Sequence, residues 1–326
     1  MAFLEVKNLR THFFTRRGIV KAVDGVDFHV DRGETFGLVG ESGCGKSMTC
    51  LSILRLVPQP AGQIVEGEIL LEGNDLLKKS EEEMRRIRGS RVSMILQDPM
   101  TSLNPVFTVG NQVMESLKIH LGLRGKPLWD KAKRMLEMVR IASPEVRLKN
   151  WPHQLSGGMR QRVVGAISLS CKPRLLIADE PTTSLDATIQ MQYLRLLREI
   201  QEETGLTLIF ITHDLGIVAR MCKRAAVMYA GRIVETATVR DLFNHPAHPY
   251  TQALLRSVPK VEENVARLAS IEGQPPPLHQ LPPHCIFAPR CSRADDQCWK
   301  EAYPPKVQLD EDHLVNCWKY AQTGKG

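Results

Sequence analysis

The sequence lacks any apolar run that approaches the roughly 18 residues needed to cross a bilayer as a helix. Its first residues, Met1 to Lys7, also lack the basic-then-apolar order of a secretory signal peptide. The net charge of +7 suits nucleotides, nucleic acid or an anionic membrane face. Basic and aromatic residues do not interleave in the manner used to stack nucleic-acid bases. We therefore expect a cytoplasmic protein that does not itself cross a membrane and binds no nucleic acid.

The chain is long enough to bury a sizeable core. Its 326 residues are 43% apolar and 24% charged, which is ordinary for a globular protein of one large domain with an appendage, or of two domains. Disulfides are not expected in a reducing compartment. Of the eight cysteines, four are scattered and are expected to be small buried hydrophobes: Cys44, Cys50, Cys171 and Cys222.

One glycine-rich stretch has the pattern of a loop that wraps phosphate groups, G-x-x-x-x-G-K-[ST]. An apolar run, 36–39, predicts a buried strand before it, and 48–54 predict a helix after it. Backbone N–H groups of such a loop surround an anion, Lys46 reaches the β- and γ-phosphates, and the Ser47 hydroxyl binds Mg²⁺. The expected nucleotide-binding residues are Gly40, Glu41, Ser42, Gly43, Cys44, Gly45, Lys46, Ser47 and Met48.

Further apolar runs predict core strands at 92–96, 175–178 and 206–212, each followed by polar residues. Gln97 follows the first strand, Asp179 and Glu180 the second, and His213 the third. Strands separated by helices predict a parallel α/β sheet, and ligands bind at the carboxyl ends of such strands. Asp179 can hold Mg²⁺ through water, and Glu180 can face an attacking water.

Other segments complete the outline of the fold. Residues 3–9 and 26–30 predict short strands on either side of a turn at 16–18, and 225–234 predict a hairpin. Helical spacing over about 100–170 predicts an inserted helical subdomain. Within it, Ser156, Gly157 and Gly158 open a helix, which predicts a second anion site at a positive helix end.

Together these residues resemble the ATPase subunits of ABC transporters. The matching motifs occur in the family's order: Gly40–Ser47 (Walker A), Gln97 (Q-loop), Leu155–Gln161 (signature), Leu175–Glu180 (Walker B), Ser184–Asp186 (D-loop) and His213 (switch histidine). One departure is Met159, where the commonest signature has glutamine. The resemblance implies a P-loop ABC cassette over 1–255, with a parallel core sheet, an antiparallel β subdomain and the helical insert, followed by a small C-terminal extension over 256–326 that contains cysteines.

The resemblance also implies a mechanism. Phe13 lies where the family's adenine-stacking aromatic sits. Two cassettes pair head to tail, so that Ser156–Gly158 contact the ATP of the partner. Glu180 polarises the attacking water, His213 contacts the γ-phosphate, and Mg²⁺ is held by Ser47, Gln97 and Asp179.

Residues 97–105 and 248–255 resemble the peptide and nickel importer branch, closest to the D-type ATPases of dipeptide and oligopeptide permeases. Expected partners are a second ATPase subunit, by preference a paralogue, two integral membrane permease subunits and an extracytoplasmic binding protein. The expected location is the cytoplasmic face of the inner or plasma membrane, as a peripheral subunit. The alternatives are a glutathione or nickel importer, a soluble ABC ATPase that acts on nucleic acid, and a non-catalytic scaffold subunit.

The C-terminal region has a proline-rich linker and then Cys285, Cys291, Cys298 and Cys317. Zinc sites favour C-x₂₋₄-C pairs, which this set lacks, and wider spacing suits a [4Fe–4S] cluster better. Similar permease ATPases carry a cysteine-bearing tail, in some cases around such a cluster. We therefore expect a structural [4Fe–4S] cluster, with four unliganded thiols as the alternative.

Overall fold

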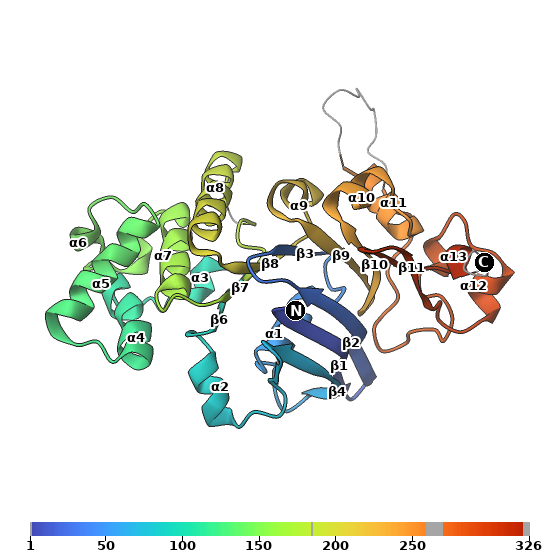
Figure 1. Ribbon diagram of the computed structural model, residues 1–326, viewed down its shortest axis with the longest axis horizontal. Coiled ribbons are helices and arrows are strands. Elements are labelled where there is room, and N and C mark those ends of the chain that lie inside the picture. The colour runs from blue at the N-terminus through green and yellow to red at the C-terminus, as the bar shows by residue number, and fades with distance from the viewer. Residues whose placement is uncertain (1, 184, 259–269, 322–326) are drawn as a thin grey trace. The chain divides into compact units, whose positions relative to one another are not determined.

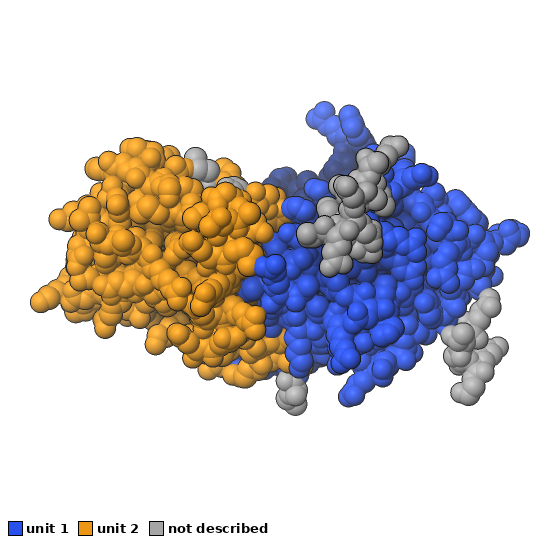
Figure 2. All heavy atoms as spheres, turned by 90° about the horizontal axis from the view of Figure 1, so that it is seen from above, with its two compact units in different colours: residues 1–30, 35–77, 211–326 blue, residues 31–34, 78–210 orange. Residues whose placement is uncertain are grey.

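The computed structural model describes residues 2–183, 185–258 and 270–321. They form two compact units, which Figure 2 distinguishes by colour. Unit 1 consists of Met1–Val30, Thr35–Leu77 and Ile211–Gly326, and unit 2 consists of Asp31–Glu34 and Lys78–Phe210. The predicted phosphate loop therefore belongs to unit 1, and the predicted helical insert belongs to unit 2.

Unit 1 contains an antiparallel sheet with the strand order β2-β1-β4-β5. Three of its strands, β2, β1 and β4, are labelled in Figure 1. The strands are β1 (Leu4–Thr15), β2 (Gly18–Val30), β4 (Gly62–Leu71) and β5 (Asn74–Asp75). Both β1 and β2 are longer than the predicted strands 3–9 and 26–30. The reason is that the backbones of β1 and β2 stay paired up to Thr15 and Gly18. The alternation of apolar side chains, on which the prediction depended, ends before these residues.

The second set of strands in unit 1 contains the strand that leads into the phosphate loop. This strand, β3 (Thr35–Val39), is buried at all five positions and pairs in parallel with β9 (Arg224–Tyr229). As predicted, a hairpin joins β9 to β10 (Arg232–Thr238). β10 pairs with β12 (His313–Asn316), which pairs with β11 (Lys306–Asp310). Two strands from the C-terminal region thus continue the sheet that contains β3.

Helices complete unit 1. The phosphate loop is followed by α1 (Lys46–Ile53), in agreement with the predicted helix 48–54. The rings of Tyr229, Tyr250 and Phe287 pack together, with centroids 4.7 Å apart for the two tyrosines and 5.2 Å apart for Tyr229 and Phe287. The other helices of unit 1 are α9 (Leu215–Met221), α10 (Val239–Asn244), α11 (Pro249–Arg256), η2 (Ala288–Arg290), α12 (Asp296–Lys300) and α13 (Trp318–Ala321).

Unit 2 has the strand order β8-β7-β6, with β6 (Val92–Ile95) and β7 (Leu175–Asp179) parallel. β8 (Thr207–Thr212) begins in this unit. These strands agree with the predicted ones to within one residue. The helices are α2 (Glu81–Ile87), α3 (Pro99–Ser102), α4 (Val109–Leu121), α5 (Gly125–Met138), α6 (Pro144–Arg147), η1 (Pro152–Gln154), α7 (Gly157–Leu169) and α8 (Ala187–Thr204).

Several of these helices begin at the side chains that sequence rules favour for that position. Ser80, Thr108 and Ser156 each accept a backbone hydrogen bond in the first turn of the helix that follows. Among the helices that the structure describes, none is both long enough and apolar enough to span a membrane.

A buried carboxylate, Glu235, joins β10 to the segment before α11 and to β12. Its Oε1 accepts a hydrogen bond from the Ala247 N–H (2.7 Å) and lies 2.8 Å from Nε2 of His313 in β12. Its Oε2 accepts a hydrogen bond from the His248 N–H (2.9 Å). His248 in turn begins α11, because its Nδ1 accepts a hydrogen bond from the Tyr250 N–H (3.0 Å).

His248 makes the stability of the fold depend on pH. Burial lowers the pKa of its imidazole from 6.5 to about 4, against the opposing attraction of Glu235. Between about pH 6.5 and pH 4, the unfolded chain binds a proton at this histidine that the folded chain does not. The free energy of unfolding must therefore fall as the pH is lowered through this window.

We expect the variant His248→Asn to lose about 2 kcal/mol less unfolding free energy than the wild type between pH 7 and pH 5. Asparagine keeps an acceptor for the Tyr250 N–H but does not titrate. Urea denaturation at both pH values measures the difference. The exposed His245→Asn variant is the control and should follow the wild type. Equal losses in the wild type and His248→Asn would contradict the prediction.

Candidate functional site

The phosphate loop has a backbone that requires glycine at two places. Gly40 and Gly45 have φ values of 154° and 108°. A Cβ atom on Gly40 would lie 2.2 Å from the carbonyl oxygen of Met228 in β9, and one on Gly45 would lie 2.2 Å from that of Ala22 in β2. The loop therefore fits tightly against two strands of its own unit, and only glycine can be accommodated at these two positions.

Lys46 places a buried positive charge within this loop. The residue is 4% exposed, and its Nζ donates hydrogen bonds to the carbonyl oxygens of Gly40 (2.8 Å) and Glu41 (3.0 Å). Lys46 is also the first residue of α1, whose opening N–H groups have no partners within the helix. An ammonium group and a helix N-terminus at one loop make a site suited to a phosphate group.

The loop is also held by a residue that the sequence did not reveal. The hydroxyl of Tyr250, in α11, accepts a hydrogen bond from the Glu41 N–H at 3.0 Å. Tyr250 is fully buried, and burial raises the pKa of its phenol. No local pattern connects positions 250 and 41, so only the tertiary structure shows this contact.

In unit 2, two adjacent carboxylates, Asp179 and Glu180, lie at the carboxyl end of β7. Asp179 is the last residue of the strand and is buried, at 4% exposure. Glu180 has a left-handed backbone, with φ 42°, so the chain turns sharply between the two residues. Such a conformation typically costs about 1–3 kcal/mol in a non-glycine residue and is common at functional sites.

Glu180 and Gln97 meet, as their positions at neighbouring strand ends predict. The Glu180 Oε2 atom accepts hydrogen bonds from Gln97 Nε2 (3.1 Å) and from Thr183 Oγ1 (3.0 Å). Two donors on one oxygen hold the carboxylate in a defined orientation. This arrangement suits a carboxylate that must face a water molecule.

The predicted second anion site is the N-terminus of α7, also in unit 2. Ser156 caps this helix through a hydrogen bond from the Met159 N–H to its Oγ (3.3 Å). A Cβ atom on Gly157 would meet no atom within 4 Å, whereas one on Gly158 would lie 2.6 Å from Ile189 Cγ2 in α8. A hollow of about 710 Å³ opens here, lined by Ser156, Gly157 and Gly158 among others. The backbone at Gly157 is therefore open to a ligand.

Of the remaining predicted residues, His213 and Phe13 lie in unit 1 and Asp186 lies in unit 2. His213 follows β8 and is exposed, next to Asp214, whose Oδ1 accepts hydrogen bonds from the N–H groups of Gly216 (2.7 Å) and Ile217 (3.3 Å) at the start of α9. Phe13 lies in β1 and is partly buried. Ser184 lies outside the described residues, but Asp186 caps α8 with its carboxylate.

The prediction of a [4Fe–4S] cluster at Cys285, Cys291, Cys298 and Cys317 is wrong. Within the described part of the chain, which includes all four cysteines, no group of three or more His, Cys, Asp or Glu residues is placed to hold a metal ion. Cys285 and Cys298 belong to one apolar cluster, and Cys317 belongs to another with Val315.

The physical reason is that these cysteines act as small buried hydrophobes. Burial raises the pKa of each thiol, to about 11 for Cys285. Cys285, Cys298 and Cys317 are buried, and Cys291 is partly buried against the first of these clusters. Spacing alone could not distinguish the two roles, because both place cysteines in the interior of a small extension.

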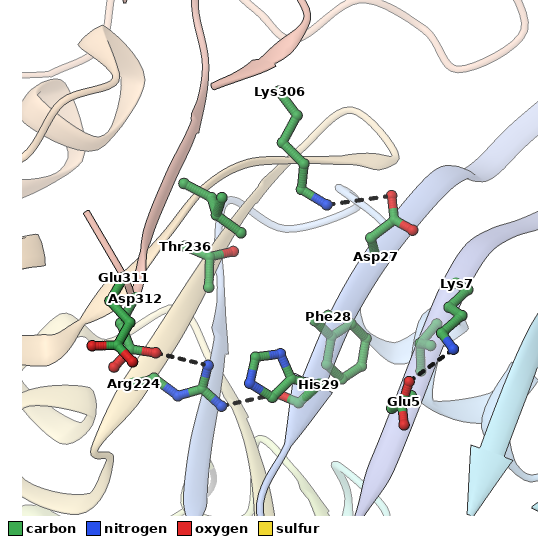
Figure 3. Close-up of a pocket in the computed structure, with 12 residues that line it drawn as sticks. Glu5, Lys7, Asp27, Phe28, His29, Arg224, Thr236, Lys306, Glu311 and Asp312 are labelled. Carbon is green, nitrogen blue, oxygen red and sulfur yellow. Dashed lines mark hydrogen bonds and ion pairs between the residues drawn. The ribbon is translucent and has the colours of Figure 1, made fainter. Parts of the chain in front are cut away.

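A separate hollow of about 200 Å³ in unit 1 contains none of the predicted site residues (Figure 3). Its charged side chains compensate one another, which leaves little net charge to attract a charged ligand. The ion pairs are Lys7 with Glu5 (2.8 Å), Lys306 with Asp27 (3.7 Å) and Arg224 with Asp312 (3.7 Å).

Comparisons with known proteins also indicate an ATP-binding subunit of a transporter. The sequence profile of the ABC transporter family matches residues 23–183, and that of the oligopeptide/dipeptide transporter C-terminal region matches residues 234–298. A probable peptide ABC transporter ATP-binding protein, y4tR of Sinorhizobium fredii, is 51% identical over 97% of this chain and 94% of its own length. The dipeptide transport ATP-binding protein DppD of Bacillus subtilis is 50% identical over 99% of this chain and 96% of its own.

Solved structures show the same fold. The ATP-binding cassette MJ0796, in a dimeric post-hydrolysis state with ADP and Pi, superposes with a TM-score of 0.66 at 26% identity. The match covers 73% of this chain and 99% of that one. The predicted cassette fold and the resemblance inferred from the motifs are thereby confirmed. The chain therefore belongs to the ATP-hydrolysing, ATP-binding proteins of the ABC transporter family, whose activity implies binding of ATP and Mg²⁺.

Proposed function

We propose that this chain is the ATP-hydrolysing subunit of an importer that takes up dipeptides or oligopeptides. One observation carries the substrate class. The chain is about half identical, over nearly its full length, to ATP-binding proteins named for peptide transport, and it shares their C-terminal region. In this proposal, residues 1–255 are the cassette and 256–326 are the extension.

Within the cassette, each predicted residue has a defined task. The glycines of the Gly40–Ser47 loop direct backbone N–H groups toward the phosphates, and buried Lys46 balances their charge. Met48, in the first turn of α1, adds to the positive end of that helix. The partly buried Phe13 stacks on the adenine ring.

The hydrolytic groups follow the same logic. Ser47, Gln97 and Asp179 would hold Mg²⁺, which supplies charge neutralisation at the β- and γ-phosphates when bound. Glu180, oriented by Gln97 and Thr183, accepts the proton of the attacking water. His213 donates to the γ-phosphate.

Pairing of two cassettes supplies the second phosphate contact. The open backbone at Gly157, beside the Ser156 hydroxyl and Gly158, suits an ATP molecule bound to the loop of a partner cassette. We propose a paralogous partner ATPase, two integral membrane permease subunits and an extracytoplasmic binding protein. The subunit would lie peripherally on the cytoplasmic face of the inner or plasma membrane.

Transport by the reconstituted complex tests this proposal. The chain is purified together with its membrane subunits, and the complex is reconstituted into proteoliposomes. MgATP should then drive uptake of a radiolabelled dipeptide that is supplied together with the binding protein. Uptake of nickel or glutathione in place of peptide would overturn the substrate class. ATP turnover that is stimulated by DNA and independent of membrane subunits would overturn the transport function.

Replacement of Glu180 by Gln should lower the ATP turnover number about a hundred- to a thousand-fold and leave MgATP binding unchanged, because one preorganised base is lost while the phosphate loop is intact. Steady-state ATPase assays and nucleotide titration measure the two quantities. The exposed Glu203→Gln variant in α8 should keep full activity. Turnover near the wild-type rate in Glu180→Gln would remove this residue from the mechanism.

The variant Gly157→Ala tests the contact with the partner's nucleotide. The added methyl group meets no atom within 4 Å, so the fold should keep its melting temperature. Turnover should nevertheless fall about tenfold or more, because the methyl group pushes the triphosphate away from the helix end. Binding of ATP to the variant's own loop should be unchanged. A variant with full turnover would exclude a close approach of nucleotide to Gly157.

A further inference from the structure

The C-terminal region reaches the phosphate loop through one arginine. Arg290, the last residue of η2, is paired with Glu41, the second residue of the loop. Its Nη1 atom donates a hydrogen bond to Glu41 Oε2 (2.8 Å), and its Nη2 atom donates one to Glu41 Oε1 (3.0 Å). The two parallel bonds form the bidentate geometry that a guanidinium and a carboxylate adopt when both are fixed.

The remaining donors of Arg290 are bonded as well. The Nε atom donates to the carbonyl oxygen of Glu272 (3.0 Å), and Nη2 also donates to that of Ile271 (3.3 Å). Nη1 also donates to the Tyr229 hydroxyl (3.4 Å). The Arg290 side chain is only 4% exposed, against 29% for Glu41. The arginine is therefore a fixed part of the C-terminal region, and the glutamate is oriented by it.

Glu41 connects Arg290 to the groups expected to bind phosphate. The Glu41 carboxylate is held by Arg290, and its N–H donates a hydrogen bond to the Tyr250 hydroxyl. Its carbonyl oxygen accepts a hydrogen bond from the Lys46 ammonium. Phe287, three residues before Arg290, packs against Tyr250 at 5.4 Å between ring centroids. The C-terminal region thus orients the side chain of one loop residue and places a positive charge against it.

The charge matters because Glu41 is a carboxylate within a loop that binds a triphosphate. Without a counter-charge it would repel phosphates bound to the same loop. With the buried guanidinium attached, its charge is compensated and its side chain is held by the C-terminal region. A lysine could supply the charge but not the two-point geometry.

We propose that Arg290 is a positioning residue through which the C-terminal extension sets the ATP affinity of the Gly40–Ser47 loop. The inference rests on the proposed role of this loop as the ATP site. It assigns to the extension an effect on nucleotide binding, separate from the hydrolytic step at Glu180.

The test is a comparison of variants of the full chain in the ATPase assay, with ATP affinity measured independently by nucleotide titration. Arg290→Ala should raise the KM for ATP about tenfold, the effect expected for loss of a hydrogen-bonded charge pair, while kcat stays within about twofold. Arg290→Lys should recover part of the affinity. Glu41→Gln combined with Arg290→Ala should recover most of it, because the uncompensated carboxylate is gone.

The exposed arginine on the same segment supplies the matched control: Arg293→Ala should behave as the wild type. If the double variant has the same raised KM as Arg290→Ala, altered packing of the extension explains the effect and the inference is overturned. A fall in kcat at unchanged KM, or no change in either, overturns it as well.

Lys46→Ala, measured in the same titration, distinguishes this inference from the proposed function. Loss of ATP binding in Lys46→Ala together with a normal Arg290→Ala variant would refute only the role of Arg290. Normal binding in Lys46→Ala would refute the loop as the ATP site, and with it both proposals.

Discussion

The close approach of the phosphate loop to the backbone of β2 and β9 is the constraint on which the rest of the site depends. Gly40 and Gly45 leave no room for a side chain against Met228 and Ala22, so this shape of the loop requires glycine at both positions. This shape encloses the Lys46 ammonium and starts α1 with its N-terminus at the loop. A preformed loop spends little binding energy on ordering itself, which leaves more of that energy for recognition of the triphosphate.

The predicted hydrolytic residues depend on a different constraint, the buried strand β7. Its apolar residues fix the strand in the core, and the turn at Glu180 then separates two adjacent carboxylates. The hydrogen bonds from Gln97 and Thr183 show that the Glu180 carboxylate is held by its neighbours. A strained backbone persists only where surrounding contacts support it, and here the polar side chains of Gln97 and Thr183 supply such contacts.

The sequence predicted the features that depend on local chemistry. Each of these features can be recognised from residues that are adjacent in the sequence. They are the glycines at 40 and 45, the apolar strands that precede Gln97 and Glu180, and the serine cap of α7. Long-range features escaped prediction. Arg290 and Glu41 are 249 positions apart, and β11 is so exposed that no apolar pattern indicates a strand. The four C-terminal cysteines misled, because burial in an apolar cluster and metal binding favour the same residue type.

A structure of the assembled Glu180→Gln complex with MgATP tests the central claim most directly. The account predicts that each triphosphate contacts the Gly40–Ser47 loop of one cassette and the Ser156–Gly158 helix end of the other. Nucleotide held by its own loop alone, with the opposite helix end away from the phosphates, would contradict it.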